Sequence, residues 1–403
     1  MKTHYAKRIH TTVIGGGQAG LSVAYHLVRR GIPFQVLDAN QRIGNAWRNR
    51  WDSLRLFTPA RYAGLPGLPF PAPGNTFPTK QEVADYLESY ATHFRLPVQT
   101  GVKVDRLSRR EDRFVVTAGN RRFESQNVVV AMANFQVPRR PVFAPELDPG
   151  IVQMHSNEYR NPSQLQDGPV LIVGAGNSGA DIAMEVVQTR PTWMSGKESG
   201  HIPFPIEGAL ARHFLWSAVR FLGHHVLTVS TPIGRKLRPT LLCGASPLIR
   251  IKPHDLVNAG IERVPRVVGL RNGRPLLADG RTLDVKNVVW CTGYEPGFSW
   301  IDLPIFGKDG RPMHERGVVS RVSGMYFVGL HYLYAMTSAT VVGVGRDAEH
   351  IARAIESATL ARGSQEVRRL GPAEAASAAS HRRGNESLAG QGWRLRAFLP
   401  SGW

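Results

Sequence analysis

The stretch IHTTVIGGGQAGLSVAYHLVRRGIPFQVLD at residues 9–38 decides the fold. Residues 9–14 are mostly apolar or β-branched and predict a short buried strand, and the apolar positions after the glycines recur at helical spacing. Gly31 ends that helix, and FQVLD at 34–38 follows as a second strand. A strand, a helix and a strand in this order predict a βαβ unit of an α/β fold.

The glycines between the first strand and the helix have the spacing of a dinucleotide-binding turn. Gly15, Gly17 and Gly20 form GxGxxG, in which the first glycine makes the tight turn, the second admits a pyrophosphate and the third lets the helix pack on the strand. Asp38 ends the second strand, where a carboxylate accepts ribose hydroxyls. The acid favours an unphosphorylated ribose, as in FAD or NAD.

A second unit of the same kind occurs at residues 169–197, PVLIVGAGNSGADIAMEVVQTRPTWMSGK. Gly174, Gly176 and Gly179 repeat the spacing, but Ser195 and Lys197 stand where the first unit has its acid. A hydroxyl and a cation there favour a 2′-phosphate, so this unit is predicted to bind NADP. The alternative is that Lys197 is an ordinary surface lysine. Two sites with different ribose chemistry predict electron transfer from a nicotinamide to a flavin.

The strands around these units predict two Rossmann-like domains, with the NADP domain inserted between the halves of the FAD domain. NVVVAM at 127–132 is expected to return to the first sheet, and strands resume at 287–293 and 325–330. The expected limits are 1–150 and 289–360 for the FAD domain, 151–288 for the NADP domain with an amphipathic insertion at 204–250, and 361–403 for a flexible basic tail.

Composition narrows the function further. The 403 residues, 42% of them hydrophobic, are enough for two domains, and the net charge of +19 is spread along the chain without a basic block, which disfavours nucleic-acid binding. Cys243 and Cys291 form no CxxC pair, which excludes a dithiol reductase, and no metal-ligand motif is present. The sequence shows no signal peptide and no long apolar run, so a cytoplasmic location is expected.

Four further motifs resemble the flavin-containing monooxygenases, especially the bacterial CzcO-like branch related to the plant YUCCA enzymes. They are GNAWRNRWDSLRLFTPARYAGLPGLPFP at 44–71, FPTKQEVADYL at 77–87, CTGYEP at 291–296 and GVGRDAEHIA at 343–352. The resemblance covers about residues 12–358. It implies FAD and NADPH as cofactors, with NADH left open as an alternative donor, and O2 as co-substrate.

The resemblance also implies which residues contact the cofactors. Trp47 lines the flavin, the Thr292-Gly293 turn links the two domains, and Gly329 closes over the flavin ring. The expected cofactor-binding residues are Gly15, Gly17, Gln18, Ala19, Gly20, Asp38, Trp47, Thr58, Val104, Gly174, Gly176, Asn177, Ser178, Gly179, Ser195, Lys197, Thr292, Gly293 and Gly329.

The chain departs from the family pattern in three places. The signature FxGxxxHxxx(Y/F) keeps His155 and Tyr159 but has Pro149 and Ile151 in its first two fixed positions. The Trp-Pro ending of typical Baeyer–Villiger enzymes is missing, and the usual ATG turn reads MAN at 132–134. His155 is interpreted as a structural histidine at a domain interface, and a catalytic role is the alternative.

By resemblance, the enzyme is an NADPH-dependent monooxygenase that forms a C4a-(hydro)peroxyflavin and transfers one oxygen atom to a small hydrophobic amine, sulfide, or carbonyl or 2-oxo acid. Thr58 and His331 are the candidate catalytic residues, as polar groups near the reacting oxygen. Two alternatives share the cofactor motifs: an NADPH oxidase or reductase that releases H2O2, and a non-enzymatic redox sensor that signals through its basic surface or tail.

The amphipathic segment at 207–230 is expected to be a lid buried over the substrate channel. Leu210, Phe214, Leu215, Trp216, Val219, Phe221 and Leu222 form its apolar side. The alternative is weak peripheral contact with a membrane surface, without stable insertion. The expected partner is a small-molecule substrate, and the oligomeric state is left open.

Overall fold

The computed structural model describes residues 7–198, 200–243 and 246–365. The chain divides after residue 352 into two units, 1–352 and 353–403. Both glycine-rich turns and every strand of the described residues lie in the first unit, which ends in a helical stretch, 344–352. Residues 353–365 of the second unit are helical, and the rest of the predicted tail lies outside the described residues.

The first sheet is built around β1, which pairs in parallel with β2 on one side and with β6 on the other. β16, which comes late in the chain, pairs in parallel with β6, and Met325 lies opposite Val128. The predicted return of the 127–132 strand to this sheet is confirmed, and the strand expected at 325–330 joins it there. In spatial order the strands are β3 (Val98–Gln99), β2 (Phe34–Leu37), β1 (Lys7–Ile14), β6 (Arg121–Val130), β5 (Arg113–Ala118) and β4 (Arg106–Arg110), with β16 (Met325–Phe327) beside β6.

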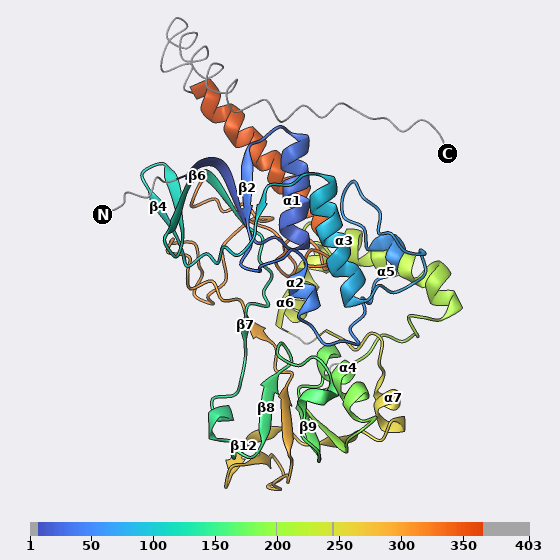
Figure 1. The fold of residues 1–403 in the computed structure, drawn as a ribbon. Coiled ribbons are helices and arrows are strands. Elements are labelled where there is room, and N and C mark those ends of the chain that lie inside the picture. The colour runs from blue at the N-terminus through green and yellow to red at the C-terminus, as the bar shows by residue number, and fades with distance from the viewer. Residues whose placement is uncertain (1–6, 199, 244–245, 366–403) are drawn as a thin grey trace, which may run out of the picture. The chain divides into compact units, whose positions relative to one another are not determined.

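Helix α1 (Gln18–Arg29) follows β1 directly and buries Leu21, Val23 and Leu27 completely. α3 (Lys80–His93) lies beside α1, and the short α2 (Asn45–Arg48) packs against α3 (Figure 1). α3 begins with a capping box in which the Thr79 hydroxyl accepts from the Glu82 backbone and the Glu82 carboxylate accepts from the Thr79 backbone.

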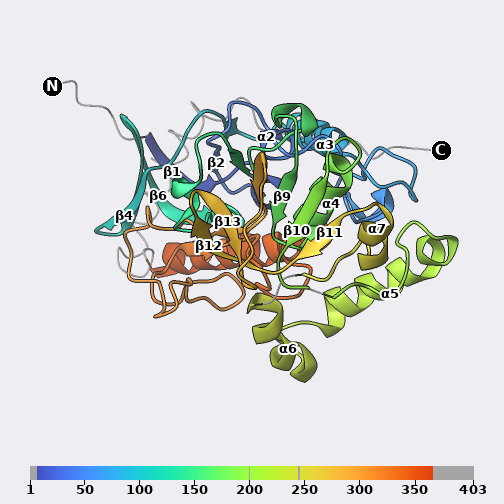
Figure 2. The same ribbon diagram turned by 90° about the horizontal axis from the view of Figure 1, so that it is seen from below.

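The second sheet is wholly parallel, with a layer on each face (Figure 2). Ile172, Met194 and Val289 pack on one face against α4 and α7, and Leu171, Val288 and Trp290 pack on the other against the hairpin β12–β13. In spatial order the strands are β11 (Glu262–Val264), β10 (Thr192–Ser195), β9 (Val170–Val173), β14 (Asn287–Trp290) and β8 (Val152–His155); the covering elements are α4 (Asn177–Val186), α7 (Pro253–Asn258), β12 (Val267–Arg271) and β13 (Arg274–Leu277).

Two segments cross between the sheets as an antiparallel pair, β7 (Val137–Pro138) and β15 (Tyr294–Glu295). The second sheet thus lies, in chain order, between β6 and β16 of the first, which confirms the predicted fold class: two Rossmann-like domains with one inserted in the other. The domain limits stay predictions. Short 3₁₀ turns complete the connections: η1 (Ala60–Tyr62), η2 (Ala144–Glu146) and η3 (Pro162–Gln164).

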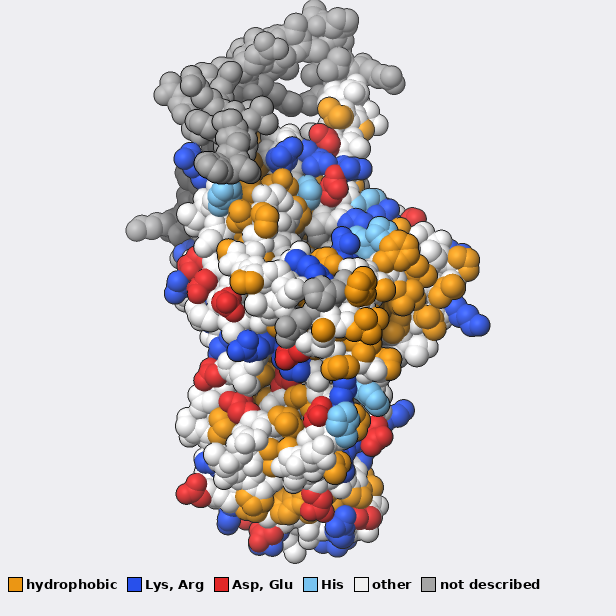
Figure 3. Space-filling model, turned by 90° about the vertical axis from the view of Figure 1, so that its right-hand side faces the viewer, with side chains coloured by type: hydrophobic (Ala, Val, Ile, Leu, Met, Phe, Trp, Pro, Cys, Tyr) orange, Lys and Arg blue, Asp and Glu red, His pale blue; other side chains and the backbone are white. Residues whose placement is uncertain are grey.

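The insertion between β10 and β11 is more helical than the sequence predicts. It contains η4 (Ala211–Leu215) and η5 (Leu222–Val226), both π-helical, with α5 (Trp216–Phe221) between them, and then α6 (Pro232–Cys243). The expectation that its apolar side is buried is wrong for Leu210, Phe214, Phe221 and Leu222, which are exposed. Figure 3 shows hydrophobic side chains gathered on the face that carries α5.

Candidate functional site

The first glycine turn has one position that the protein itself leaves open. A Cβ on Gly15, whose φ is +109°, would lie 3.0 Å from the carbonyl oxygen of Ala131, and one on Gly20 would lie 1.8 Å from the oxygen of Gly15. Gly17 has an ordinary φ of −82°, and nothing lies within 4 Å of its Cβ position. Packing therefore requires Gly15 and Gly20, whereas Gly17 leaves space at the N-terminus of α1 that fits a pyrophosphate.

Asp38 follows β2 and lies against this turn. Its carboxylate is buried, and Oδ2 accepts a 2.8 Å hydrogen bond from the Gly16 backbone. Oδ1 accepts from the Asn40 backbone at 2.7 Å and from the Asn40 amide at 2.8 Å. These donors fix the carboxylate beside the open turn, where the sequence predicts the ribose of FAD.

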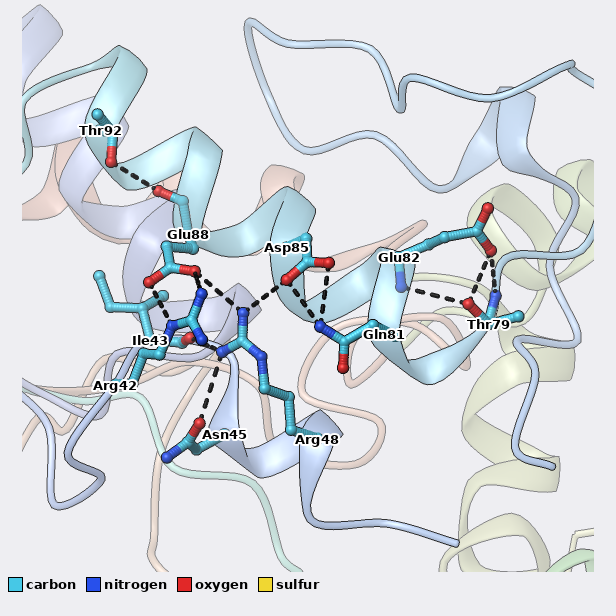
Figure 4. Close-up of polar contacts among 10 residues, drawn as sticks. All are labelled: Arg42, Ile43, Asn45, Arg48, Thr79, Gln81, Glu82, Asp85, Glu88 and Thr92. Carbon is cyan, nitrogen blue, oxygen red and sulfur yellow. Dashed lines mark hydrogen bonds and ion pairs between the residues drawn. The ribbon is translucent and has the colours of Figure 1, made fainter. Parts of the chain in front are cut away.

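An ion-pair cluster holds α2 on α3 (Figure 4). Glu88 accepts two 2.7 Å hydrogen bonds from Arg42, and Arg48 donates to Asp85 at 2.8 Å and to Glu88 at 3.0 Å. Hydrogen bonds from these arginines hold the pKa values of Asp85 and Glu88 below their usual range. Sequence reasoning missed this cluster, because pairs about 40 residues apart leave no periodic signal.

The cluster positions Trp47, which is half-buried in α2. Its indole Nε1 donates to the side-chain oxygen of Gln18, the first residue of α1, at 3.3 Å. Ala19, next in α1, would be 2.9 Å from a Cβ on Gly329, whose φ is +83°. Trp47, Gln18 and Gly329 are therefore gathered around the start of α1. Val104, in contrast, is half-buried against the core beneath the first sheet.

The two candidate catalytic residues are not linked by any contact among the described residues. Thr58 is half-buried, and its hydroxyl makes no hydrogen bond within that part of the chain. The His331 backbone donates to the Asn134 side chain at 3.1 Å, and its ring meets that of Phe135 edge to face at 5.1 Å. Burial around the ring lowers the pKa of His331, which favours the neutral imidazole at pH 7.

The second glycine turn repeats the geometry of the first. A Cβ on Gly174, at φ +119°, would lie 2.2 Å from the oxygen of Cys291, and one on Gly179 would lie 1.9 Å from the oxygen of Gly174. Gly176 has a φ of −83° and nothing within 4 Å of its Cβ position. The N-terminus of α4 therefore offers the same open space for a pyrophosphate.

Some side chains around the second turn are already bonded to the protein backbone, and others are accessible. The Ser195 hydroxyl is buried, donates to the Pro265 oxygen at 2.9 Å and accepts from the Val267 backbone at 3.1 Å. The Asn177 amide likewise holds the returning insertion, at Pro247 and Ile249. Ser178, beside Asn177, is half-buried.

Two cations lie at the end of β10. Lys197 is exposed, and Arg263 on the neighbouring strand β11 donates to the Gly196 oxygen at 2.7 Å. Burial lowers the pKa of Arg263. Sequence reasoning missed Arg263, although the parallel pairing of β10 with β11, with Met194 opposite it, brings it to the same edge.

The crossing segments carry the predicted linking turn. The Thr292 hydroxyl donates to the Arg139 oxygen, and the Arg139 backbone donates to the Gly293 oxygen at 2.9 Å. His155 is buried; its Nε2 lies 3.0 Å from the same Gly293 oxygen, and its Nδ1 accepts from Asn157 at 3.1 Å. Nε2 of His155 therefore contacts the linker at Gly293, and Nδ1 holds the turn that follows β8, in keeping with the interpretation of His155 as a structural residue.

The described residues give less support to a metal-dependent or thiol-dependent reaction. No group of three His, Cys, Asp or Glu side chains in that part of the chain is arranged to hold a metal ion. Cys291 is a free thiol, and burial raises its pKa to about 12. None of the described helices is long and apolar enough to cross a membrane.

Comparisons with known proteins identify relatives of this chain. Residues 12–195 match the family model described as pyridine nucleotide-disulphide oxidoreductase. A CzcO-like uncharacterized oxidoreductase of Geobacillus kaustophilus is 39% identical, over 85% of this chain and 97% of the relative. The probable indole-3-pyruvate monooxygenase YUCCA3 of Arabidopsis thaliana is 29% identical, over 74% and 77%. The solved flavin-containing monooxygenase of Stenotrophomonas maltophilia is 28% identical, with a TM-score of 0.69 over 87% and 99%.

Two open glycine turns on two Rossmann-like sheets define a two-domain oxidoreductase that binds FAD and NADP(H). Within that class, the chain belongs to the flavin-containing monooxygenase family, in its CzcO-like branch, as the sequence motifs predict. It is a flavoprotein monooxygenase with FAD and NADP(H) as cofactors, and O2 is the typical co-substrate of such enzymes.

Proposed function

We propose that this monooxygenase takes its electrons from NADPH and transfers one oxygen atom of O2 to a small hydrophobic substrate. The proposal rests on the charges beside the two glycine turns, which are otherwise alike. The carboxylate of Asp38 lies beside the first turn, and the cations Lys197 and Arg263 lie beside the second. A carboxylate suits the free ribose of FAD, and cations suit the 2′-phosphate of NADPH.

In this proposal the chain binds and orients the flavin with the first turn, Gly15 to Gly20, with Asp38 and with the side chain of Trp47. Bound FAD and NADPH supply the redox chemistry: hydride transfer to the flavin and activation of O2. Thr292 and Gly293 set the linker between the two domains, and Gly329 lies beside Ala19 at the start of α1. The roles of Gln18 and Val104 follow from the same family resemblance.

For the nicotinamide cofactor we propose Gly174, Gly176 and Gly179 as the pyrophosphate turn and Lys197 with Arg263 as the phosphate contacts. Ser195 supports this edge from below, because its hydroxyl already bonds to the backbone on both sides. NADH lacks the 2′-phosphate and is expected to be the poorer donor.

Thr58 and His331 remain the proposed polar groups near the reacting oxygen. Thr58 offers a hydroxyl without a partner among the described residues. His331, neutral at pH 7 by its lowered pKa, offers one ring N–H donor and one acceptor.

The substrate class is an apolar amine, sulfide, or carbonyl or 2-oxo acid. The Arabidopsis relative, a probable indole-3-pyruvate monooxygenase, supports an aromatic 2-oxo acid among these. A cytoplasmic location is part of the same proposal.

The test uses the FAD-loaded enzyme with NADPH and air and adds phenylpyruvate, thioanisole or N,N-dimethylaniline. In the proposed reaction one substrate, one O2, one NADPH and one proton give one oxygenated product, one NADP⁺ and one water; with the 2-oxo acid the product is the carboxylic acid one carbon shorter, and one CO2 is released. We expect at least one of the three to give oxygenated product at close to one molecule per NADPH. Recovery of all the NADPH electrons as H2O2 with every substrate would instead establish an oxidase.

A further inference from the structure

The insertion between β10 and β11 exposes an apolar stripe on its helices. Leu210, Phe214 and Phe221 are 64%, 69% and 60% exposed, and Leu222 is also exposed. Leu210, Phe214 and Phe221 are successively four and seven residues apart, which places them on one side of the helical stretch that includes α5, and Leu222 directly follows Phe221. These side chains are largely exposed to solvent, although the Phe221 ring also lies 5.2 Å from that of His225.

α6 repeats the pattern. Ile233, Leu237 and Leu241 are spaced four residues apart and are exposed. Of the fourteen large apolar side chains that are exposed in the described residues, seven lie between 210 and 241. Such a concentration marks an interaction surface rather than scattered surface residues. We define the outer face as Leu210, Phe214, Phe221, Leu222, Ile233, Leu237 and Leu241.

The charge around the outer face has one sign. Residues 208–250 contain no Asp or Glu, although the chain as a whole has 31 acidic residues. Arg235 and Lys236 are exposed on α6, whereas Arg220 of α5 is exposed but lies 5.4 Å from the centre of the Tyr62 ring. A partner that fits this surface is therefore both apolar and negatively charged.

The opposite side of the insertion is fixed to the rest of the first unit. The hydroxyls of Tyr62 and Ser217 are 2.8 Å apart, and the Val229 backbone donates to the Tyr334 oxygen at 2.8 Å. Nδ1 of His224 lies 3.1 Å from the hydroxyl of Thr337. The outer face is thus exposed because the inner side is already packed.

We propose that the outer face binds the surface of a membrane that contains anionic phospholipid. Apolar stripes flanked by Lys and Arg are the pattern of helices that lie in the plane of the interface, with the apolar side chains among the acyl chains and the cations at the headgroups. A second copy of the chain fits less well. A two-fold contact through this face would bring Arg235 and Lys236 of both copies together with no acidic residue in the segment to compensate.

The test is flotation of the FAD-loaded full chain with vesicles of phosphatidylcholine alone or mixed with phosphatidylglycerol. We expect binding to the mixed vesicles, at least tenfold weaker binding to phosphatidylcholine alone, and weakening in 0.5 M salt, because salt screens the cations. Absence of binding to the mixed vesicles, or equal binding to both kinds, would overturn the proposal.

Paired variants locate the contact. Phe214→Ser with Phe221→Ser should reduce binding to the mixed vesicles at least tenfold, and Lys236→Glu should reduce it severalfold. The matched control is Val257→Ser with Val268→Ser, two side chains that are 64% and 52% exposed elsewhere on the second domain. Retained FAD content and NADPH oxidation will show that the variants are folded. Unchanged binding by the Phe variant would overturn the proposal, as would a dimer in analytical ultracentrifugation that the same variant abolishes.

Discussion

Arg50 and Tyr294 are 244 positions apart in the chain, yet the guanidinium Nη1 of Arg50 donates a 2.7 Å hydrogen bond to the phenol oxygen of Tyr294. The guanidinium carbon also lies 5.6 Å from the centre of that ring. Arg50 follows α2 of the flavin domain and Tyr294 begins the returning linker, so this bond joins the two domains beside the proposed flavin site.

Tyr294→Phe should slow hydride transfer without releasing FAD. The variant keeps the ring contact and removes the hydroxyl, and a hydrogen bond to a charged group is worth about 1.5–3 kcal/mol. We expect the rate of anaerobic FAD reduction by NADPH to fall about threefold to tenfold, because the linker is held less firmly, while FAD affinity stays unchanged. Stopped-flow bleaching of the flavin measures this rate; an unchanged rate would show that the bond does not position the domains.

Asp38→Asn should weaken FAD binding at least tenfold. An amide has only one acceptor oxygen, so it cannot accept from Gly16 and from Asn40 as the carboxylate does, and an unsatisfied buried donor costs about 1–3 kcal/mol. Titration of the apoprotein with FAD measures the affinity. Asp105→Asn is the control, because Asp105 also accepts from a hydroxyl and a backbone N–H but lies at a distant turn. Equal losses in both variants would contradict the assigned role of Asp38.

Lys197→Ala should change the choice of coenzyme. Loss of a charge-assisted contact to the 2′-phosphate is expected to lower kcat/KM for NADPH about tenfold, and NADH should change less than twofold because it has no phosphate there. Initial rates with both coenzymes measure the effect, with the exposed Lys308→Ala as control. A parallel loss for NADPH and NADH would show that Lys197 does not contact the phosphate.

His224→Asn should flatten the acid side of the stability profile. Burial, with Arg346 as a further cause, lowers the pKa of His224 from 6.5 to about 4. Between these pH values the unfolded chain binds a proton here that the folded chain does not, so stability rises with pH in this window. Asn keeps a polar atom toward Thr337 and removes the titration, so the slope should fall by up to about 1.4 kcal/mol per pH unit. Urea unfolding from pH 4.5 to 7 measures both slopes, and parallel curves would contradict the prediction.

The two βαβ units and their order could be predicted from the sequence, because short apolar strands, the glycine spacing and helical periodicity are local signals. The return of β16 to β6 was also predictable, since NVVVAM and MYFVGL are apolar runs of strand length. β8, at Val152–His155, was missed: its four residues are too few to establish a period.

Tertiary arrangement accounts for the other differences. α6 contains Pro239 and Gly234, which argue against a helix locally; a Cβ on Gly234 would lie 2.0 Å from the Thr228 oxygen, so glycine is required there by close packing. The sequence indicates that Phe214 and Phe221 lie on one apolar side, but periodicity is the same whether that side meets protein, lipid or water. Arg263 could not be predicted as a phosphate contact from the sequence, because only the pairing of β11 with β10 brings it to that edge.

The most direct test of the central claim is oxygen labelling. The FAD-loaded enzyme is incubated with NADPH, ¹⁸O2 and the substrate that gives the most product per NADPH, and the product is analysed by mass spectrometry. The account predicts one ¹⁸O atom in each product molecule and the other in water. An unlabelled product, with the NADPH electrons recovered as labelled H2O2, would contradict it.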